Sequence, residues 1–182
     1  MQKLLDSNIS EEFKYLRNKL LERSFNFLNP AQLRAVFEVD GPSVVLAGAG
    51  SGKTTAVINR ILNIVNYGNS YINNNISEEI CADSIKVLKS AYENNLSADS
   101  VRDIIRSNVA DPSEILAITF TNKAANELKE RLYKSIGERS KNIWACTFHS
   151  FCARVLRSYA NKLGYNNNFV VYDEASSIIA SN

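Results

Sequence analysis

Apolar residues along this chain alternate between helical spacing and short β-branched runs. Helical spacing predicts helices over residues 1–28, 31–39, 53–66, 123–136 and 150–163. Short apolar runs predict buried strands at 43–47, 114–120 and 143–147, with 169–172 as a further strand or an extended segment. Because strands and helices alternate, we expect an α/β fold with a parallel sheet flanked by helices.

Residues 67–113 interrupt this alternation. The stretch begins with loop composition, since asparagines cluster there with Gly68 and Ser70. Two short amphipathic segments follow, one around Leu88 and one around Ile104. We therefore predict a helical insertion on the surface of the domain.

Composition sets broad limits on the class of protein. The 182 residues are enough for one domain with a sizeable core, and the net charge of +2 is too small to indicate nucleic-acid binding without a local basic surface. Cys81, Cys146 and Cys152 lack C-x-x-C spacing, which argues against a disulfide framework or a zinc site. Neither a membrane span nor a signal peptide is recognisable in the sequence, so we expect a cytoplasmic protein.

A glycine-rich loop stands between the first predicted strand and the helix over 53–66. Its text, A-G-A-G-S-G-K-T-T, is close to the phosphate-loop signature G-x-x-x-x-G-K-[ST], with alanine at the first position. Glycines let backbone N–H groups face a phosphate, and the following helix adds its N-terminal dipole. Lys53 can reach the β- and γ-phosphates, and the Thr54 hydroxyl can join a Mg²⁺ shell. The alternative is a glycine-rich turn that binds no nucleotide.

The expected nucleotide contacts of this loop are Ala47, Gly48, Ala49, Gly50, Ser51, Gly52, Lys53, Thr54 and Thr55.

Four stretches together resemble UvrD/Rep-like superfamily 1 DNA helicases. They are L-N-P-A-Q-L-R-A-V at 28–36 (glutamine motif), the phosphate loop at 46–54, I-T-F-T-N-K-A-A at 118–125 (motif Ia) and T-F-H-S-F at 147–151 (motif Ib). The resemblance implies a P-loop NTPase (RecA-like) fold that uses ATP and Mg²⁺. It also implies an ATP-dependent helicase that translocates 3′ to 5′ on single-stranded DNA, in replication, repair or recombination.

The resemblance also implies roles for single residues. Gln32 would read the adenine edge, because its amide both donates and accepts hydrogen bonds. The residues implied to line the path of single-stranded DNA are Phe120, Thr121, Asn122, Thr147, Phe148 and His149. Aromatic rings offer stacking platforms for bases. Core packing at strand ends is the alternative for Phe120 and Phe148, and a structural role is the alternative for His149.

The chain departs from the family pattern in several places. Thr55 stands where the family often has arginine, and the insertion at 67–113 is longer than in compact members. Asp173-Glu174 resembles a Walker B end, but serines stand where the family's D-E-x-Q-D has Gln and Asp, so we favour a different F-x-x-Y-D segment there. The insertion is either a structural addition that only packs against the domain, or an appendage that binds a partner or lies near DNA.

These features predict that residues 1–182 are the N-terminal part of the first motor domain of a longer helicase. The remaining helicase domains would follow after residue 182, and this part alone would bind nucleotide weakly and hydrolyse little. A helicase–nuclease subunit and a non-catalytic nucleotide-binding interaction module are alternatives. The sequence after residue 182 would decide between a helicase without a nuclease and a helicase–nuclease subunit.

Overall fold

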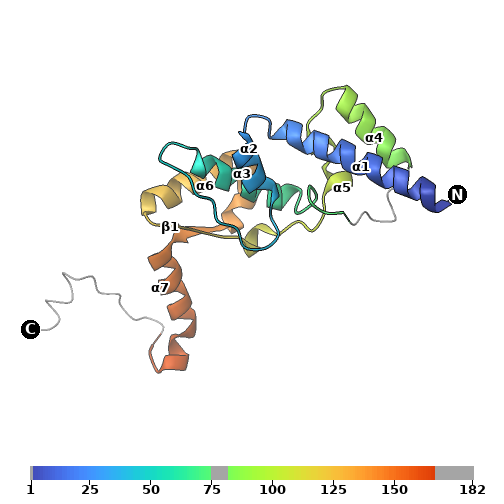
Figure 1. The fold of residues 1–182 in the computed structure, drawn as a ribbon. Coiled ribbons are helices and arrows are strands. Elements are labelled where there is room, and N and C mark those ends of the chain that lie inside the picture. The colour runs from blue at the N-terminus through green and yellow to red at the C-terminus, as the bar shows by residue number, and fades with distance from the viewer. Residues whose placement is uncertain (1, 75–81, 167–182) are drawn as a thin grey trace, which may run out of the picture.

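The computed structural model describes residues 2–74 and 82–166, and Figure 1 shows how their elements follow one another. The longer helices are α1 (Gln2–Ser24), α2 (Pro30–Phe37), α3 (Lys53–Asn66), α4 (Ala82–Glu93), α6 (Asn122–Ile136) and α7 (Phe148–Tyr159). Shorter helical segments are η1 (Ala98–Val101), α5 (Arg102–Ile105), η2 (Pro112–Glu114), η3 (Gly137–Asn142) and η4 (Ala160–Leu163). The strands are β1 (Leu116–Thr119) and β2 (Trp144–Thr147).

Most predicted elements are confirmed. The helices expected at 31–39, 53–66, 123–136 and 150–163 are α2, α3, α6, and α7 with η4. The strands expected at 114–120 and 143–147 are β1 and β2, and they pair in parallel. The described residues are therefore mostly helical with a small parallel sheet, which is compatible with an α/β fold. The segment predicted at 169–172 lies outside the described residues.

The strand predicted at 43–47 is wrong for this structure. These residues are irregular and exposed, and the side chains of Val44 and Leu46 are 86% and 91% exposed. A strand exists only when a neighbouring strand takes its backbone hydrogen bonds. Within the described residues, β1 and β2 pair with each other and neither pairs with residues 43–47.

Helix starts follow local sequence signals. The Asn29 side chain accepts a hydrogen bond from Gln32 N at 3.0 Å, and the Gln32 side chain accepts one from Asn29 N at 3.1 Å, which completes a capping box before α2. Thr121 and Thr147 cap α6 and α7 through their hydroxyl oxygens. These polar caps set where each helix begins.

The small sheet packs against α3 and α6. Ala145 of β2 and Ile143, which directly precedes this strand, are buried with Leu128 and Leu132 of α6, and Ile61 of α3 joins the same apolar cluster. The strand register pairs Leu116 with Trp144 at one end and Thr119 with Thr147 at the other. The chain segments that follow β1 and β2 therefore emerge side by side at the carboxyl ends of the strands.

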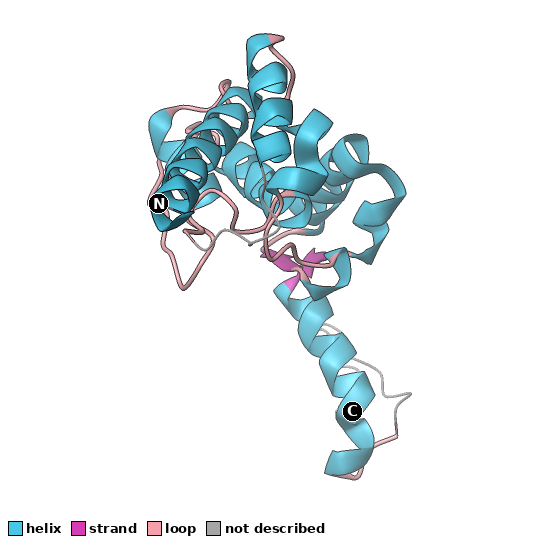
Figure 2. Cartoon of the chain, turned by 90° about the vertical axis from the view of Figure 1, so that its right-hand side faces the viewer, coloured by secondary structure: helices cyan, strands magenta, loops and turns pink. Residues whose placement is uncertain are grey.

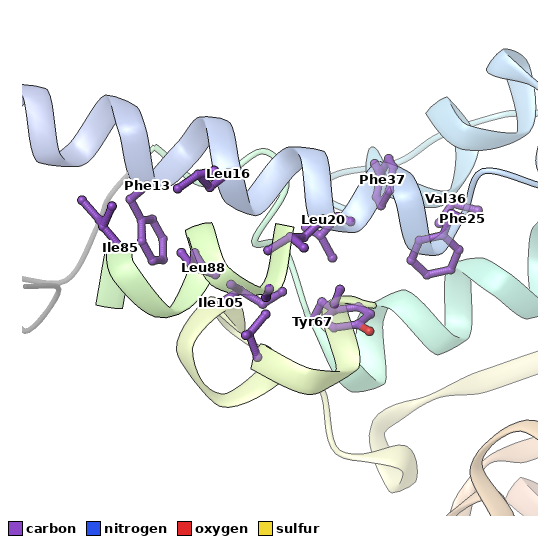
Figure 3. Packing of buried hydrophobic residues seen from close by; sticks show 14 of the residues in the cluster. Phe13, Leu16, Leu20, Phe25, Val36, Phe37, Tyr67, Ile85, Leu88 and Ile105 are labelled. Carbon is purple, nitrogen blue, oxygen red and sulfur yellow. The ribbon is translucent and has the colours of Figure 1, made fainter. Parts of the chain in front are cut away.

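The segment predicted to be an insertion, residues 67–113, contributes to a second apolar core. Leu88 of α4, Val101 of η1 and Ile105 of α5 are buried against Leu16 and Leu20 of α1, as Figure 3 shows for part of this cluster. Apolar residues at helical spacing on both α1 and α4 create these complementary faces. The insertion is thus integrated with the N-terminal helix, which lies beside α4 in Figure 1.

Polar contacts attach α1 to the insertion around this core. Glu12 pairs with Lys89 at 2.6 Å, and the Arg23 guanidinium donates to Tyr92 O at 2.9 Å while it stacks over the Tyr92 ring. Arg17 is buried and donates to Asn73 O at 3.1 Å. Burial lowers the pKa of Arg17 to about 10, so the guanidinium stays charged at neutral pH.

The helix α7 stands apart from the α-helices that precede it in the chain. Figure 2 shows α7 projecting from the small sheet, away from the other helices. None of its residues is buried, and Leu156 and Tyr159 on it are about half exposed. The amphipathic pattern of α7 therefore presents an apolar face that the described residues leave uncovered.

No helix within residues 2–74 and 82–166 is both long enough and apolar enough to cross a membrane.

We predict that Gly68→Ala strongly destabilises the fold. Gly68 has φ +65°, and a β-carbon there would overlap the carbonyl oxygen of Ser107, which pairs with this position in an isolated bridge. We expect a loss of about 3 kcal/mol in the free energy of unfolding, measured by urea denaturation. Gly164→Ala is the matched control, since φ is +78° but the space is open, and it should lose only ~1–2 kcal/mol. Equal losses would contradict the clash.

Candidate functional site

The glycine loop leads directly into α3. Gly50 and Gly52 have φ +74° and +81°, a backbone region that residues with side chains adopt rarely. Gly52 is the N-cap of α3 and supplies no side-chain cap, so no side chain covers the amides of the first turn there. Uncapped amides and the helix dipole favour an anion at this end. The loop therefore fits a phosphate group.

Lys53 and Thr54 begin α3, and both side chains are exposed. The Lys53 ammonium donates hydrogen bonds to Gly48 O at 2.6 Å and to Ala47 O at 3.1 Å. The positive charge is thereby held over the loop, within reach of a group seated on it. Phosphate oxygens could replace these carbonyls as acceptors.

Gln32 lies beside the same loop. Its Nε2 donates to Ser51 O at 3.0 Å, and its Oε1 accepts from Asn29 N. An amide has two donor hydrogens and two acceptor lone pairs, so one donor and one acceptor remain for a ligand. A β-carbon at Gly52 would collide with Gln32 Nε2, which shows how closely the side chain approaches the loop.

Two residues that sequence reasoning missed attach α2 to α3. Arg60 Nη1 donates to Ala35 O at 2.5 Å and to Glu38 O at 2.6 Å, both near the end of α2. Asn63, which is 1% exposed, donates from Nδ2 to Val36 O at 3.2 Å. The helix α2 is thus attached to the glycine loop through Gln32 in its first turn, and to α3 near its C-terminal end. The sequence signal that could have identified Arg60 and Asn63 is that both are polar residues on the inner face of the amphipathic helix predicted at 53–66.

A largely apolar groove of about 420 Å³ opens beside the glycine loop. It lies between α3 and β1, and its lining includes Lys53 and Thr54 together with Val57, Ile61 and Ile118. Lys53 and Thr54, which we expect to contact phosphate and Mg²⁺, therefore line a groove that is large enough to hold a ligand or another segment of polypeptide.

The strand-end loops bring together the other predicted residues. Phe120 and Thr121 connect β1 to α6, which begins at Asn122, while Phe148 and His149 begin α7 directly after β2. The register places these two strand ends side by side. Phe120 is fully exposed and Phe148 is 58% exposed. Core packing therefore does not explain Phe120, and it explains Phe148 poorly. Both rings are available to a partner on this edge.

The two threonines act as helix caps. Thr121 Oγ1 accepts from Ala124 N at 3.2 Å, and Thr147 Oγ1 accepts from Ser150 N at 3.3 Å. Thr147 is 6% exposed, so its side chain orients α7 from within the fold and has little surface for a ligand. His149 is exposed, with its ring 6.4 Å from that of Phe148.

No cluster of three or more His, Cys, Asp or Glu side chains that could hold a metal ion occurs in the described ranges 2–74 and 82–166. Thr54, the predicted Mg²⁺ contact, lies exposed in the first turn of α3. Asp173-Glu174, the Walker B alternative, lies outside the described residues.

Comparisons with known proteins add a family relationship. A sequence model of the family described as UvrD/REP helicase N-terminal domain matches residues 28–82 and 98–180. The chain is 35% identical over 164 residues, 90% of its length, to the ATP-dependent DNA helicase PcrA of Bacillus subtilis (strain 168). It is 34% identical over 81% of its length to PcrA of Staphylococcus aureus (strain Mu50 / ATCC 700699), and 36% identical over 84% to the ATP-dependent DNA helicase UvrD1 of Mycobacterium leprae (strain TN).

The chain spans only 15–16% of the length of these relatives. The stretches outside the family match are 1–27, 83–97 and the last two residues. The first two contain α1 and nearly all of α4, which pack against each other in the second apolar core. The core that α1 and α4 share also contains Val101 and Ile105 of the predicted insertion, which lie inside the matched residues.

Proposed function

The chain belongs to the UvrD/REP helicase N-terminal domain family, and from this premise we propose that residues 1–182 are the N-terminal part of the first motor domain of an ATP-dependent DNA helicase. The helicase translocates 3′ to 5′ on single-stranded DNA, in replication, repair or recombination. The observation that carries the proposal is the contact of Gln32 with Ser51, which joins the glutamine motif to the glycine loop. The action on DNA agrees with the cytoplasmic location expected from the sequence.

The loop from Ala47 to Thr55 binds ATP in this proposal. Backbone amides at the start of α3 hold the phosphates, Lys53 neutralises the β- and γ-phosphates, and Gln32 presents its remaining donor and acceptor to adenine. Thr54 would offer its hydroxyl as a ligand to a Mg²⁺ ion, which would neutralise phosphate charge. The exposure of Lys53 and Thr54 and the uncapped helix start support this assignment.

Single-stranded DNA passes over the loops that follow β1 and β2. Phe120 and Phe148 stack on bases, while Thr121, Asn122 and His149 contact the backbone. Thr147 positions this segment by capping α7. The exposure of both phenylalanines, and the register that brings the two loops together, support the path.

The two strands belong to a larger RecA-like parallel sheet. Parallel sheets are buried on both faces in proteins of the α/β class, whereas Leu116 and Ile118 of β1 are about half exposed. The groove between α3 and β1 has a largely apolar lining that further strands could cover. The rest of the first motor domain would supply the missing strands, and the remaining helicase domains, C-terminal to this chain, would complete the catalytic centre. Residues 67–113 are an insertion within this domain.

Unwinding by the full-length protein tests this function. We expect ATP-dependent displacement of a duplex with a 3′ single-stranded tail, and much slower displacement when the tail is 5′. Unwinding from the 5′ tail would contradict the direction. DNA degradation that accompanies unwinding would favour a helicase–nuclease subunit, and ATP binding without turnover would favour a non-catalytic interaction module.

A further inference from the structure

A second cavity, of about 520 Å³, lies along β2 on the side of α7. Its lining includes three basic side chains, Lys129, Lys141 and Arg154, and no acidic one. Trp144 lies in the same lining and is 37% exposed. Cations around an aromatic ring are the groups that bind phosphates and bases of nucleic acid.

The basic groups differ in how far they are already neutralised. Lys141 pairs with Glu138 at 2.6 Å, so part of its charge is balanced. The Arg154 guanidinium stacks over the Trp144 ring, with Cζ 3.9 Å from the ring centroid, and within the described residues no carboxylate forms an ion pair with it. In the part of the chain that the structure describes, no acidic group pairs with Lys129. Lys129 and Arg154 are therefore the main anion-binding groups.

The cavity is continuous with the DNA path proposed above. Ser150 lines the cavity, and its hydroxyl lies 2.8 Å from the Thr147 hydroxyl at the start of α7. Phe148 and His149 occupy the turn between these two residues. A strand that stacks on Phe148 can thus reach the cavity by following the first turn of α7.

We propose that this cavity binds phosphates of single-stranded DNA, with Lys129 and Arg154 as the contacting cations. The inference rests on the proposed function, because it extends the same strand beyond the strand-end loops. Two cations in one cavity favour phosphodiester groups as the ligand. Their location beside exposed aromatic rings favours a single strand of nucleic acid over a free anion. The cavity thereby lengthens the contact between the motor domain and its DNA.

Fluorescence anisotropy with a labelled oligothymidylate of about 16 nucleotides, and the full-length protein, tests the cavity. Lys129→Ala should raise the dissociation constant roughly three- to tenfold and lower the slope of log K against log salt by about one. Arg154→Met should have a comparable effect. Lys134→Ala is the matched control, since it removes the same charge from an exposed position on α6 that does not line the cavity.

Equal effects of Lys129→Ala and Lys134→Ala on the dissociation constant would overturn the proposal that the cavity binds DNA, because general surface charge would then explain the binding. Phe120→Ala separates this failure from failure of the proposed function. If Phe120→Ala weakens binding and Lys129→Ala acts like the control, the DNA path stands without the cavity. If the unaltered protein binds no single-stranded DNA, both are wrong.

Discussion

Lys53→Ala is expected to abolish the ATPase activity of the full-length protein. The Lys53 ammonium is held over the glycine loop by Ala47 O and Gly48 O, where it would meet the transferred phosphate. Loss of one preorganised charge at a developing anion lowers turnover by about 10²–10³-fold, and more where the same group also holds the substrate. Steady-state ATP hydrolysis measures the effect.

Two controls accompany this variant. Lys53 is exposed, so the alanine variant should unfold within ~0.5 kcal/mol of the unaltered protein and should still bind single-stranded DNA. Lys134→Ala removes a charge from another exposed helical position and should leave turnover unchanged. ATP hydrolysis retained by Lys53→Ala would refute the assignment of the loop as the phosphate site.

Phe120→Ala is expected to weaken binding of single-stranded DNA while nucleotide binding stays unchanged. The Phe120 ring is fully exposed after the end of β1, and base stacking on one aromatic ring contributes about 1–3 kcal/mol. The dissociation constant should therefore rise roughly five- to 150-fold. Anisotropy of a labelled oligonucleotide measures the first quantity, and a fluorescent ATP analogue measures the second.

Phe27→Ala is the matched control, because Phe27 is 64% exposed and lies between α1 and α2, outside the strand-end loops. It should leave DNA binding unchanged. Equal loss of DNA and nucleotide binding in Phe120→Ala, or the same loss in Phe27→Ala, would contradict the proposed path.

Local sequence signals were enough to place the helices that carry the site. The helix predicted at 53–66 matches α3, because a glycine loop sets its start and apolar spacing sets its length. The capping side chains Asn29, Thr121 and Thr147 define the starts of α2, α6 and α7. Such interactions join residues a few positions apart, so the sequence alone is informative.

Interactions between distant segments were not predictable in the same way. The strand at 43–47 was predicted from its composition, but strand formation depends on partners that composition does not specify. The helix α1 packs on α4, and α2 is attached to α3 through Arg60 and Asn63. The hydrophobic pattern of each helix shows that it has a buried face but does not specify which other helix packs there. For the site, the sequence identified Gln32, and the structure added its bond to Ser51.

The ratio of ATP hydrolysis with and without single-stranded DNA tests the central claim most directly. In the full-length protein we expect strong stimulation by DNA, because the glycine loop and the strand-end loops belong to one motor domain. The stimulation should fall in Phe120→Ala, and turnover should disappear in Lys53→Ala. Hydrolysis that DNA does not change, or its absence under all conditions, would contradict the account.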